Sequence, residues 1–94
     1  MNTPEVKAYI RQRAYLFWHI PDNKKEDISH ELLVETILNY GNLDDVRNLF
    51  SVLSLDYVAS IFMNLKGRKK FNYYPEIYNF FKLYFEKHAQ RNTQ

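Results

Sequence analysis

The stretch from Leu32 to Leu53 limits the possible folds most, because two helical apolar patterns meet inside it. In the first pattern, apolar residues recur at three- and four-residue steps up to Leu38, as one face of a helix requires. The second pattern begins at Leu43, shortly after the first one stops. With so little connecting chain, the two predicted helices must pack as a tight hairpin or an angled corner.

Gly41 and Asn42 lie where the first helix should end and the second should begin. Glycine is a poor helix residue and tolerates the left-handed conformation that ends helices, so we expect the first helix to end at Gly41 in that conformation. Asn42 is expected to cap the next helix through its side-chain oxygen. Asp44 and Asp45 then place negative charge at the positive end of the helix dipole. The sequence therefore predicts a helix-Gly-helix corner at Gly41.

The N-terminal segment predicts one helix and one loop. Thr3 and Pro4 suit the cap and the first position of a helix, where proline loses no helical hydrogen bond. The apolar face continues to Trp18, and Pro21 forces the helix to end. Residues 22–27, DNKKED, are all polar, and we expect them to form a solvated loop.

The other helix boundaries follow from the same rules. The helix before the corner is expected over residues 28–40, with Asp27 as its cap. Ser54 is suited either to end the helix after the corner or to cap a fourth helix. Residues 66–74, KGRKKFNYY, interrupt the apolar spacing and are predicted to form a loop. Pro75 then starts the last helix.

A chain of 94 residues is long enough for one hydrophobic core. We predict a single all-α domain over residues 1–94, a compact bundle of about five helices. Its core spans about residues 4–88, and residues 89–94 are expected to fray. The predicted core side chains are Phe17, Trp18, Ile37, Leu38, Val46, Phe50, Ile61, Phe62, Phe80, Phe81 and Tyr84.

The composition excludes several chemistries. Cysteine is absent, which rules out disulfides and thiolate metal sites. The three histidines belong to no metal-ligand motif, and we expect His30 to be an exposed residue at a helix start. No serine lies in a nucleophile motif, and two glycines cannot build a phosphate-binding loop. We therefore predict a protein that is not an enzyme and has no cofactor or metal.

Hydropathy points to a location in the cell. No apolar run approaches the roughly 20 residues that span a bilayer. The chain also opens with no signal-peptide pattern of a basic start and an apolar core. We therefore expect a soluble cytoplasmic protein that has no contact with a membrane.

Residues 66–74 and the start of the last helix form the candidate interaction surface: Lys66, Arg68, Lys69, Lys70, Tyr73, Tyr74 and Tyr78. Cations interleaved with aromatic rings suit single-stranded nucleic acid, where cations follow phosphates and rings stack on bases. An acidic protein partner fits the same cations equally well. In the simplest alternative, Phe71, Tyr73 and Tyr74 pack on the core and the cations only solvate a loop.

The helix pair at Gly41 also has the outline of a DNA-binding helix-turn-helix. A recognition helix needs basic or amide side chains that reach base edges. The helix after the corner offers only Arg47 and Asn48, and it begins with Asp44 and Asp45. Repulsion between these carboxylates and phosphate argues against a role in a DNA groove.

The last helix carries aromatic residues around more of its circumference than one buried stripe requires. They are Tyr78, Phe80, Phe81, Tyr84 and Phe85. We favour a helix at the centre of the bundle, because aromatic side chains dominate core burial. In the alternative, part of this surface binds a partner, which includes self-association.

Three segments resemble the pattern of a small family of uncharacterised bacterial all-helical proteins. They are Leu16-Phe17-Trp18 with Ile20 and Asp22, then VETILNYGNLDDV at residues 34–46, and Asn79-Phe80-Phe81. In that family, an L-F-W-D motif precedes V-L-x-Y-G-D-x-x-D, a short helix pair and an N-F-W/F helix. The likeness runs from Tyr15 to Phe85, with departures at His19 and Asn42. These are core and helix-boundary residues, so the resemblance implies a fold more than a chemistry.

Members of this family are often encoded beside nucleotidyltransferase toxins of the AbiE type. The resemblance therefore implies an antitoxin-like or regulatory role, with a nucleotidyltransferase-type toxin as the partner. We predict a non-enzymatic protein-interaction module. The alternative is a weak nucleic-acid-binding protein that uses residues 66–74. The oligomeric state is left open by the sequence.

Overall fold

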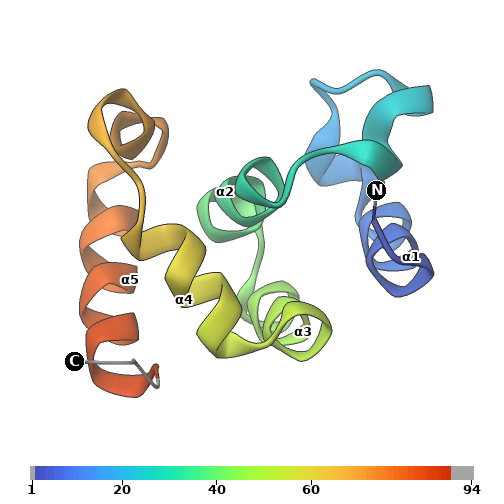
Figure 1. The fold of residues 1–94 in the computed structure, drawn as a ribbon. Coiled ribbons are helices and arrows are strands. Elements are labelled where there is room, and N and C mark those ends of the chain that lie inside the picture. The colour runs from blue at the N-terminus through green and yellow to red at the C-terminus, as the bar shows by residue number, and fades with distance from the viewer. Residues whose placement is uncertain (1, 90–94) are drawn as a thin grey trace.

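Residues 2–89, which the computed structural model describes, form five α-helices and three 3-10 helices and contain no strand (Figure 1). This confirms the predicted all-α class. The α-helices are α1 (Pro4–Gln12), α2 (His30–Tyr40), α3 (Leu43–Leu53), α4 (Leu55–Met63) and α5 (Pro75–His88). The 3-10 helices are η1 (Ala14–Phe17), η2 (Asp22–Asp27) and η3 (Gly67–Asn72). Of the residues predicted to fray, 90–94 lie outside the described part of the chain.

The corner between α2 and α3 is held by a reciprocal cap. The Asn42 side chain accepts a hydrogen bond from the Asp45 amide at 2.8 Å, which confirms the predicted cap. The Asp45 carboxylate in turn accepts a bond from the Asn42 amide at 3.0 Å. Two backbone donors at the start of α3 are thereby satisfied, which fixes the direction in which the helix leaves the corner.

The conformation predicted for Gly41 is wrong. Its backbone is extended, with φ −78° and ψ 162°, a conformation that any residue can adopt. Glycine is required here by space: a Cβ atom would lie 2.8 Å from the Ile37 carbonyl oxygen and 2.9 Å from the Asp45 Cβ. The position with a left-handed glycine is Gly67, where φ is +56°.

Gly41→Val is expected to lower the free energy of unfolding by about 1–3 kcal/mol, as overpacking of a tight site does. The reason is the contact with the Ile37 carbonyl, which belongs to the backbone and cannot move aside cheaply. Gly67→Asn is the matched control, because no atom would crowd its Cβ and asparagine tolerates the left-handed conformation. Urea denaturation of both variants measures the difference. Equal stability of Gly41→Val and the unmodified chain would contradict the steric explanation.

The first helix is shorter than predicted. α1 begins at Pro4 with Thr3 as its cap, as expected, but it ends at Gln12 instead of continuing to Trp18. At Arg13 the backbone leaves the helical region, with φ −123°, and the Arg13 side chain turns inward to bind Asp45 at 2.8 Å. The chain then continues as η1. This change of direction leaves Trp18 76% exposed, so its predicted place in the core is wrong.

The predicted loop at residues 22–27 is the 3-10 helix η2. Two of its carboxylates bind Arg11 of α1: Asp22 at 2.8 Å and Glu26 at 2.7 Å. The predicted start of α2 is also wrong. Ser29, and not Asp27, caps the helix by accepting a bond from the Leu32 amide at 3.1 Å.

The junction between α3 and α4 is a single residue. Ser54 has a φ of +75°, which ends α3, and its hydroxyl accepts a bond from the Tyr57 amide at 3.2 Å, which caps α4. Both roles that the sequence suggested for Ser54 are therefore present. No single helix within residues 2–89 is long and apolar enough to cross a membrane. Taken together, the bent pair α3 and α4 has the length and composition to do so, and nothing else within these residues indicates a membrane span.

One buried cluster of apolar side chains takes residues from all five α-helices. α1 lies at one end of the molecule and α5 at the other, with α4 packed against α5 (Figure 1). The prediction that the last helix is central is therefore wrong. Phe80, which was placed in the core, is 55% exposed, while Phe81 and Phe85 face the core. Of the other predicted core residues, Phe50, Ile61 and Tyr84 are only partly buried.

Candidate interaction surface

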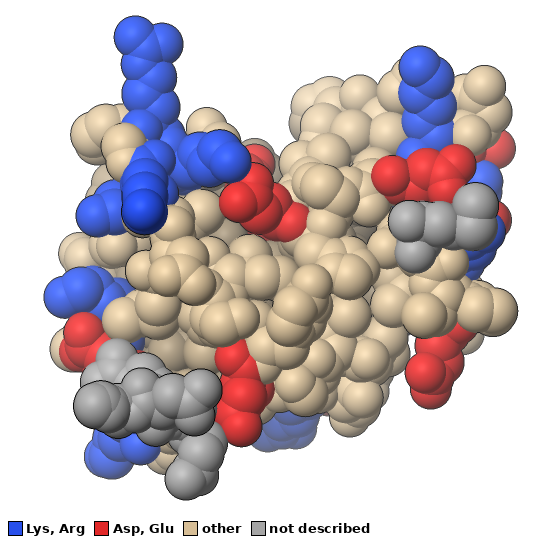
Figure 2. Space-filling model, viewed as in Figure 1, with Lys and Arg blue, Asp and Glu red and all other residues tan. Residues whose placement is uncertain are grey.

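Most of the segment at residues 66–74 folds as the 3-10 helix η3 (Gly67–Asn72) and not as the predicted loop. Left-handed Gly67 turns the chain away from α4 and into this helix. All four cations of the segment are exposed: Lys66, Arg68, Lys69 and Lys70. Figure 2 shows Lys and Arg side chains projecting at this corner of the molecule. We call the surface formed by Lys66, Arg68, Lys70 and Phe71 the basic-aromatic corner.

Helix α2 holds η3 in place. The Asn39 side chain donates to the Asn72 carbonyl oxygen at 3.0 Å and accepts from the Tyr74 amide at 3.1 Å. Lys69 forms an ion pair with Glu31 at 2.8 Å. Contacts with one rigid helix therefore fix the position of the basic-aromatic corner, and Lys69 is already paired within the chain.

The three tyrosines proposed for the surface have different surroundings. Tyr73 is buried, so its predicted place on an interaction surface is wrong: it belongs to the core. Burial raises the pKa of its phenol. Its ring packs edge-to-face on Phe62 at 5.2 Å. Tyr78 is half-buried and stacks on Phe62 at 5.0 Å. Tyr74 is half-exposed and its hydroxyl bonds the Tyr40 hydroxyl at 3.2 Å.

Phe71 is an exposed aromatic residue that the predicted interaction surface did not include. It is 84% exposed, the largest exposed fraction among the described large hydrophobic side chains. In a 3-10 helix, side chains three residues apart lie directly above one another, so Phe71 shares a side of η3 with Arg68. Tyr73 lies just after the end of η3, where the backbone is extended, and its side chain is buried.

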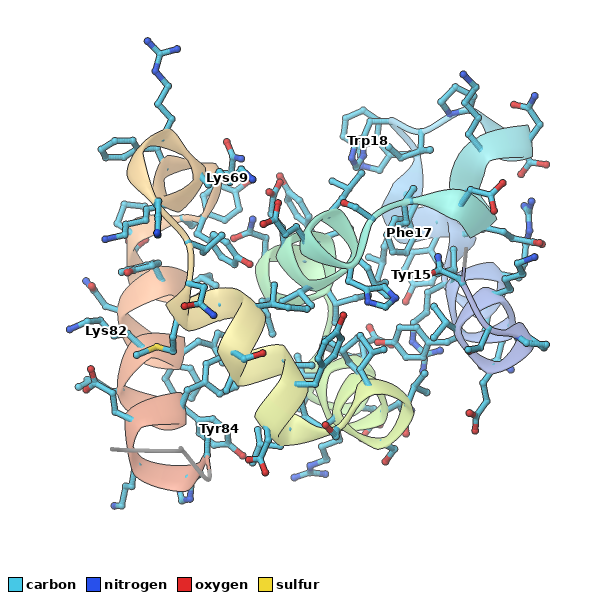
Figure 3. The ribbon with its side chains drawn as sticks, viewed as in Figure 1. Tyr15, Phe17, Trp18, Lys69, Lys82 and Tyr84 are labelled. Carbon is cyan, nitrogen blue, oxygen red and sulfur yellow. The ribbon has the colours of Figure 1, made fainter. Side chains whose placement is uncertain are left out.

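A hollow in the molecular surface separates η3 from the turn between η1 and η2 (Figure 2). Lys69 lies on one side of it and Trp18 on the other (Figure 3). The Trp18 ring contacts the His19 ring edge-to-face at 5.2 Å. Burial raises the pKa of the Glu35 carboxyl on α2, against the opposing effects of a hydrogen bond to Asn72 and the nearby charge of His19.

Glu35→Gln is expected to raise the melting temperature at pH 7 and to leave it unchanged near pH 3. A carboxyl whose folded pKa is raised contributes stability below its ordinary pKa of 4.5, and this contribution is lost as pH rises through the folded value. Glutamine keeps the acceptor oxygen and has no charge to desolvate. Thermal melts from pH 3 to pH 8 measure the effect. Destabilisation that is equal at every pH would show that the loss of packing outweighs the charge.

Two groups of polar side chains away from this surface hydrogen-bond one another inside the fold. Asp45 binds Arg13, and its carbonyl oxygen accepts a bond from the Tyr9 hydroxyl at 2.6 Å. His30, predicted to be exposed, is half-buried and bonds the Tyr57 hydroxyl at 2.6 Å and the Asn2 side chain at 2.9 Å. Within residues 2–89, no three His, Asp or Glu side chains are grouped so that they could hold a metal ion.

Comparison with known proteins found no match to a family model, to a curated protein or to a solved structure. The resemblance of the sequence to a small family of bacterial proteins therefore stays a prediction.

Proposed function

We propose that this protein is a non-enzymatic protein-interaction module that binds its partner through the basic-aromatic corner. The observation that carries the proposal is the exposure of Phe71 beside three cations on a helix that is fixed to the core. Lys66, Arg68 and Lys70 form no ion pair with another residue of the described chain, 2–89. A partner with an apolar pocket surrounded by acidic side chains complements this surface.

The anchoring of η3 favours a defined protein partner. Tyr73, directly after η3, is buried in the core, and Asn39 of α2 bonds the backbone at the end of η3. The basic-aromatic corner therefore loses little conformational freedom when it binds a partner. A rigid aromatic anchor that enters a pocket, with charges around it, is the usual arrangement of an interface hot spot.

Single-stranded nucleic acid is the second candidate. Such binding uses several rings on which successive bases stack, together with a track of cations. In this segment Tyr73 is buried, Tyr74 is engaged with Tyr40, and Lys69 is paired with Glu31. Only one highly exposed ring and three unpaired cations are left for nucleic acid, which is less than a stacking platform needs.

The resemblance to proteins encoded beside AbiE-type nucleotidyltransferase toxins identifies the partner to test first. What the resemblance implies is that this protein binds and regulates such a toxin in an antitoxin-like role. The proposal places the contact on η3, so an acidic patch with an apolar centre on the toxin is the expected counterpart.

Co-expression with the product of the neighbouring gene, followed by pull-down, tests the proposal. We expect a complex with the unmodified chain and its loss with Phe71→Ala combined with Arg68→Glu. Lys24→Glu is the matched control, because this exposed cation lies on η2, on the other side of the hollow. Recovery of no complex, or of equal complex with the double variant, would reject the proposed surface.

A fluorescence anisotropy titration separates the two candidates. We expect no binding of labelled single-stranded DNA or RNA at low salt. Binding that weakens steeply with salt and is lost with Arg68→Glu would instead support the nucleic-acid function.

A further inference from the structure

The outer face of α5 carries a regular stripe that the fold leaves open. Glu76, Phe80, Leu83 and Lys87 are all exposed and follow one another at steps of four, three and four residues. This is the spacing of the seam residues in a two-stranded coiled coil, so the four side chains lie in one line along the helix. Phe80 is 55% exposed and Leu83 is 66% exposed.

Helix α5 packs on the rest of the molecule through its other side. Phe81 and Phe85 are buried there, and α5 lies at the end of the molecule against α4 (Figure 1). Figure 3 shows Lys82 pointing away from the body of the molecule and Tyr84 lying on the side of α4. Lys82 and Glu86 pair with each other at 3.6 Å on the flank of α5, between the stripe and the buried side.

The two ends of the stripe carry opposite charges, and its centre is apolar. Glu76 lies in the first turn of α5 and Lys87 in the last turn. Neither residue forms an ion pair with another residue in the part of the chain that the structure describes, 2–89. From its first to its last residue, the stripe is therefore acidic, apolar, apolar and basic. When two such stripes run in opposite directions, the acidic end of each lies opposite the basic end of the other.

We propose that α5 is a homodimer interface at which a second copy of this chain packs antiparallel along the stripe. In this register, Phe80 packs against Leu83 of the second copy, and Glu76 faces Lys87 of the second copy. A twofold axis between Phe80 and Leu83 repeats each contact, which gives two apolar contacts and two ion pairs.

The charges select the direction of the pairing. In a parallel pair, Glu76 would face Glu76 and Lys87 would face Lys87, and like charges opposite each other are destabilising. The antiparallel pair also places the positive end of each helix dipole beside the negative end of the other. One helix face per chain makes an interface at or below about 1,200 Å², so we expect reversible dimers with a dissociation constant of roughly 10 µM to 1 mM.

Sedimentation equilibrium of the full chain over a concentration series tests the dimer. Leu83→Glu is expected to weaken association by at least about tenfold, which corresponds to the 1.4 kcal/mol of a tenfold change. Glu76→Lys or Lys87→Glu alone is expected to weaken it by about three- to tenfold, because each places like charges opposite each other. The variant with both reversals restores the pairing and is expected to return to within about twofold of the unmodified chain.

Cysteine substitution tests the register, since the chain has no native cysteine. When Phe80→Cys and Leu83→Cys chains are mixed and oxidised, the antiparallel register predicts that the mixed disulfide forms in excess over either homodisulfide. Dominant homodisulfides would show a parallel pair and overturn the proposal. A chain that stays monomeric at about 1 mM, the upper end of the expected range of dissociation constants, also overturns the proposal.

The rescue by double charge reversal is specific to a second copy. Another protein or an anionic membrane on this face would not recover affinity when both charges of this chain are exchanged. Single reversals that associate as well as the unmodified chain would therefore reject the dimer. Arg68→Glu is expected to leave dimerisation unchanged, so this inference and the proposed function succeed or fail independently. Circular dichroism melts verify that every variant is folded.

Discussion

Asp45→Ala is expected to lower the free energy of unfolding by about 3–5 kcal/mol, because it leaves the Arg13 guanidinium buried without its partner. The two side chains are about 10% and 9% exposed and their atoms lie 2.8 Å apart. The same carboxylate accepts the Asn42 amide, so the variant also loses half of the reciprocal cap of α3. A domain of this length has a stability of about 5–14 kcal/mol, of which this loss is a large part.

Asp44→Ala is the matched control. Asp44 is the neighbouring carboxylate in the first turn of α3, but it is exposed and its contact with Arg47 is 3.8 Å long. Surface pairs of this kind contribute about 0–1 kcal/mol, and we expect Asp44→Ala to cost no more than that. Urea denaturation monitored by tryptophan fluorescence and circular dichroism measures both variants. Similar losses at the two positions would mean that helix-dipole charge, and not the buried pair, stabilises this corner.

The Arg13–Asp45 pair also explains why part of the fold escaped prediction. Helix starts at Pro4, Leu43 and Pro75 follow from local rules, since caps and proline act within one turn of the chain. The end of α1 at Gln12 depends on a partner 32 residues away along the chain, which no local pattern contains. The exposure of Trp18 follows from that end, so it was missed for the same reason.

The candidate surface was predicted in one respect and missed in another. Cations at 66–70 were expected at the surface because burying an unpaired charge is costly, and they are exposed. The direction of each ring was missed because the sequence predicted a loop here, and a loop has no fixed period. Phe71 belongs to the 3-10 helix and points outward, whereas Tyr73 lies in the extended backbone after it and is buried. On α5, aromatic content alone did not reveal that Phe80 lies on the outer side of a terminal helix.

Phe62→Ala is expected to lower the free energy of unfolding by about 3–5 kcal/mol, as the loss of a fully buried aromatic side chain does. The Phe62 ring on α4 is 1% exposed. It contacts the rings of Tyr73 at 5.2 Å, Tyr78 at 5.0 Å and Phe85 at 5.3 Å. Aromatic pairs at these separations add about 0.5–1.5 kcal/mol each beyond the area they bury.

Because these partners lie in η3–α5, the loss should be unequal along the chain. Native-state hydrogen exchange is expected to show a larger fall in protection for α5 than for α1, since Phe62 is the ring through which α4 holds both proposed surfaces. Phe71→Ala removes the same ring at an exposed site and is expected to change stability by no more than about 0.5 kcal/mol. An equal fall in the protection of α1 and α5 in Phe62→Ala would contradict this prediction. It would show that the chain unfolds as one cooperative unit, in which Phe62 supports the basic-aromatic corner no more than it supports the rest of the fold.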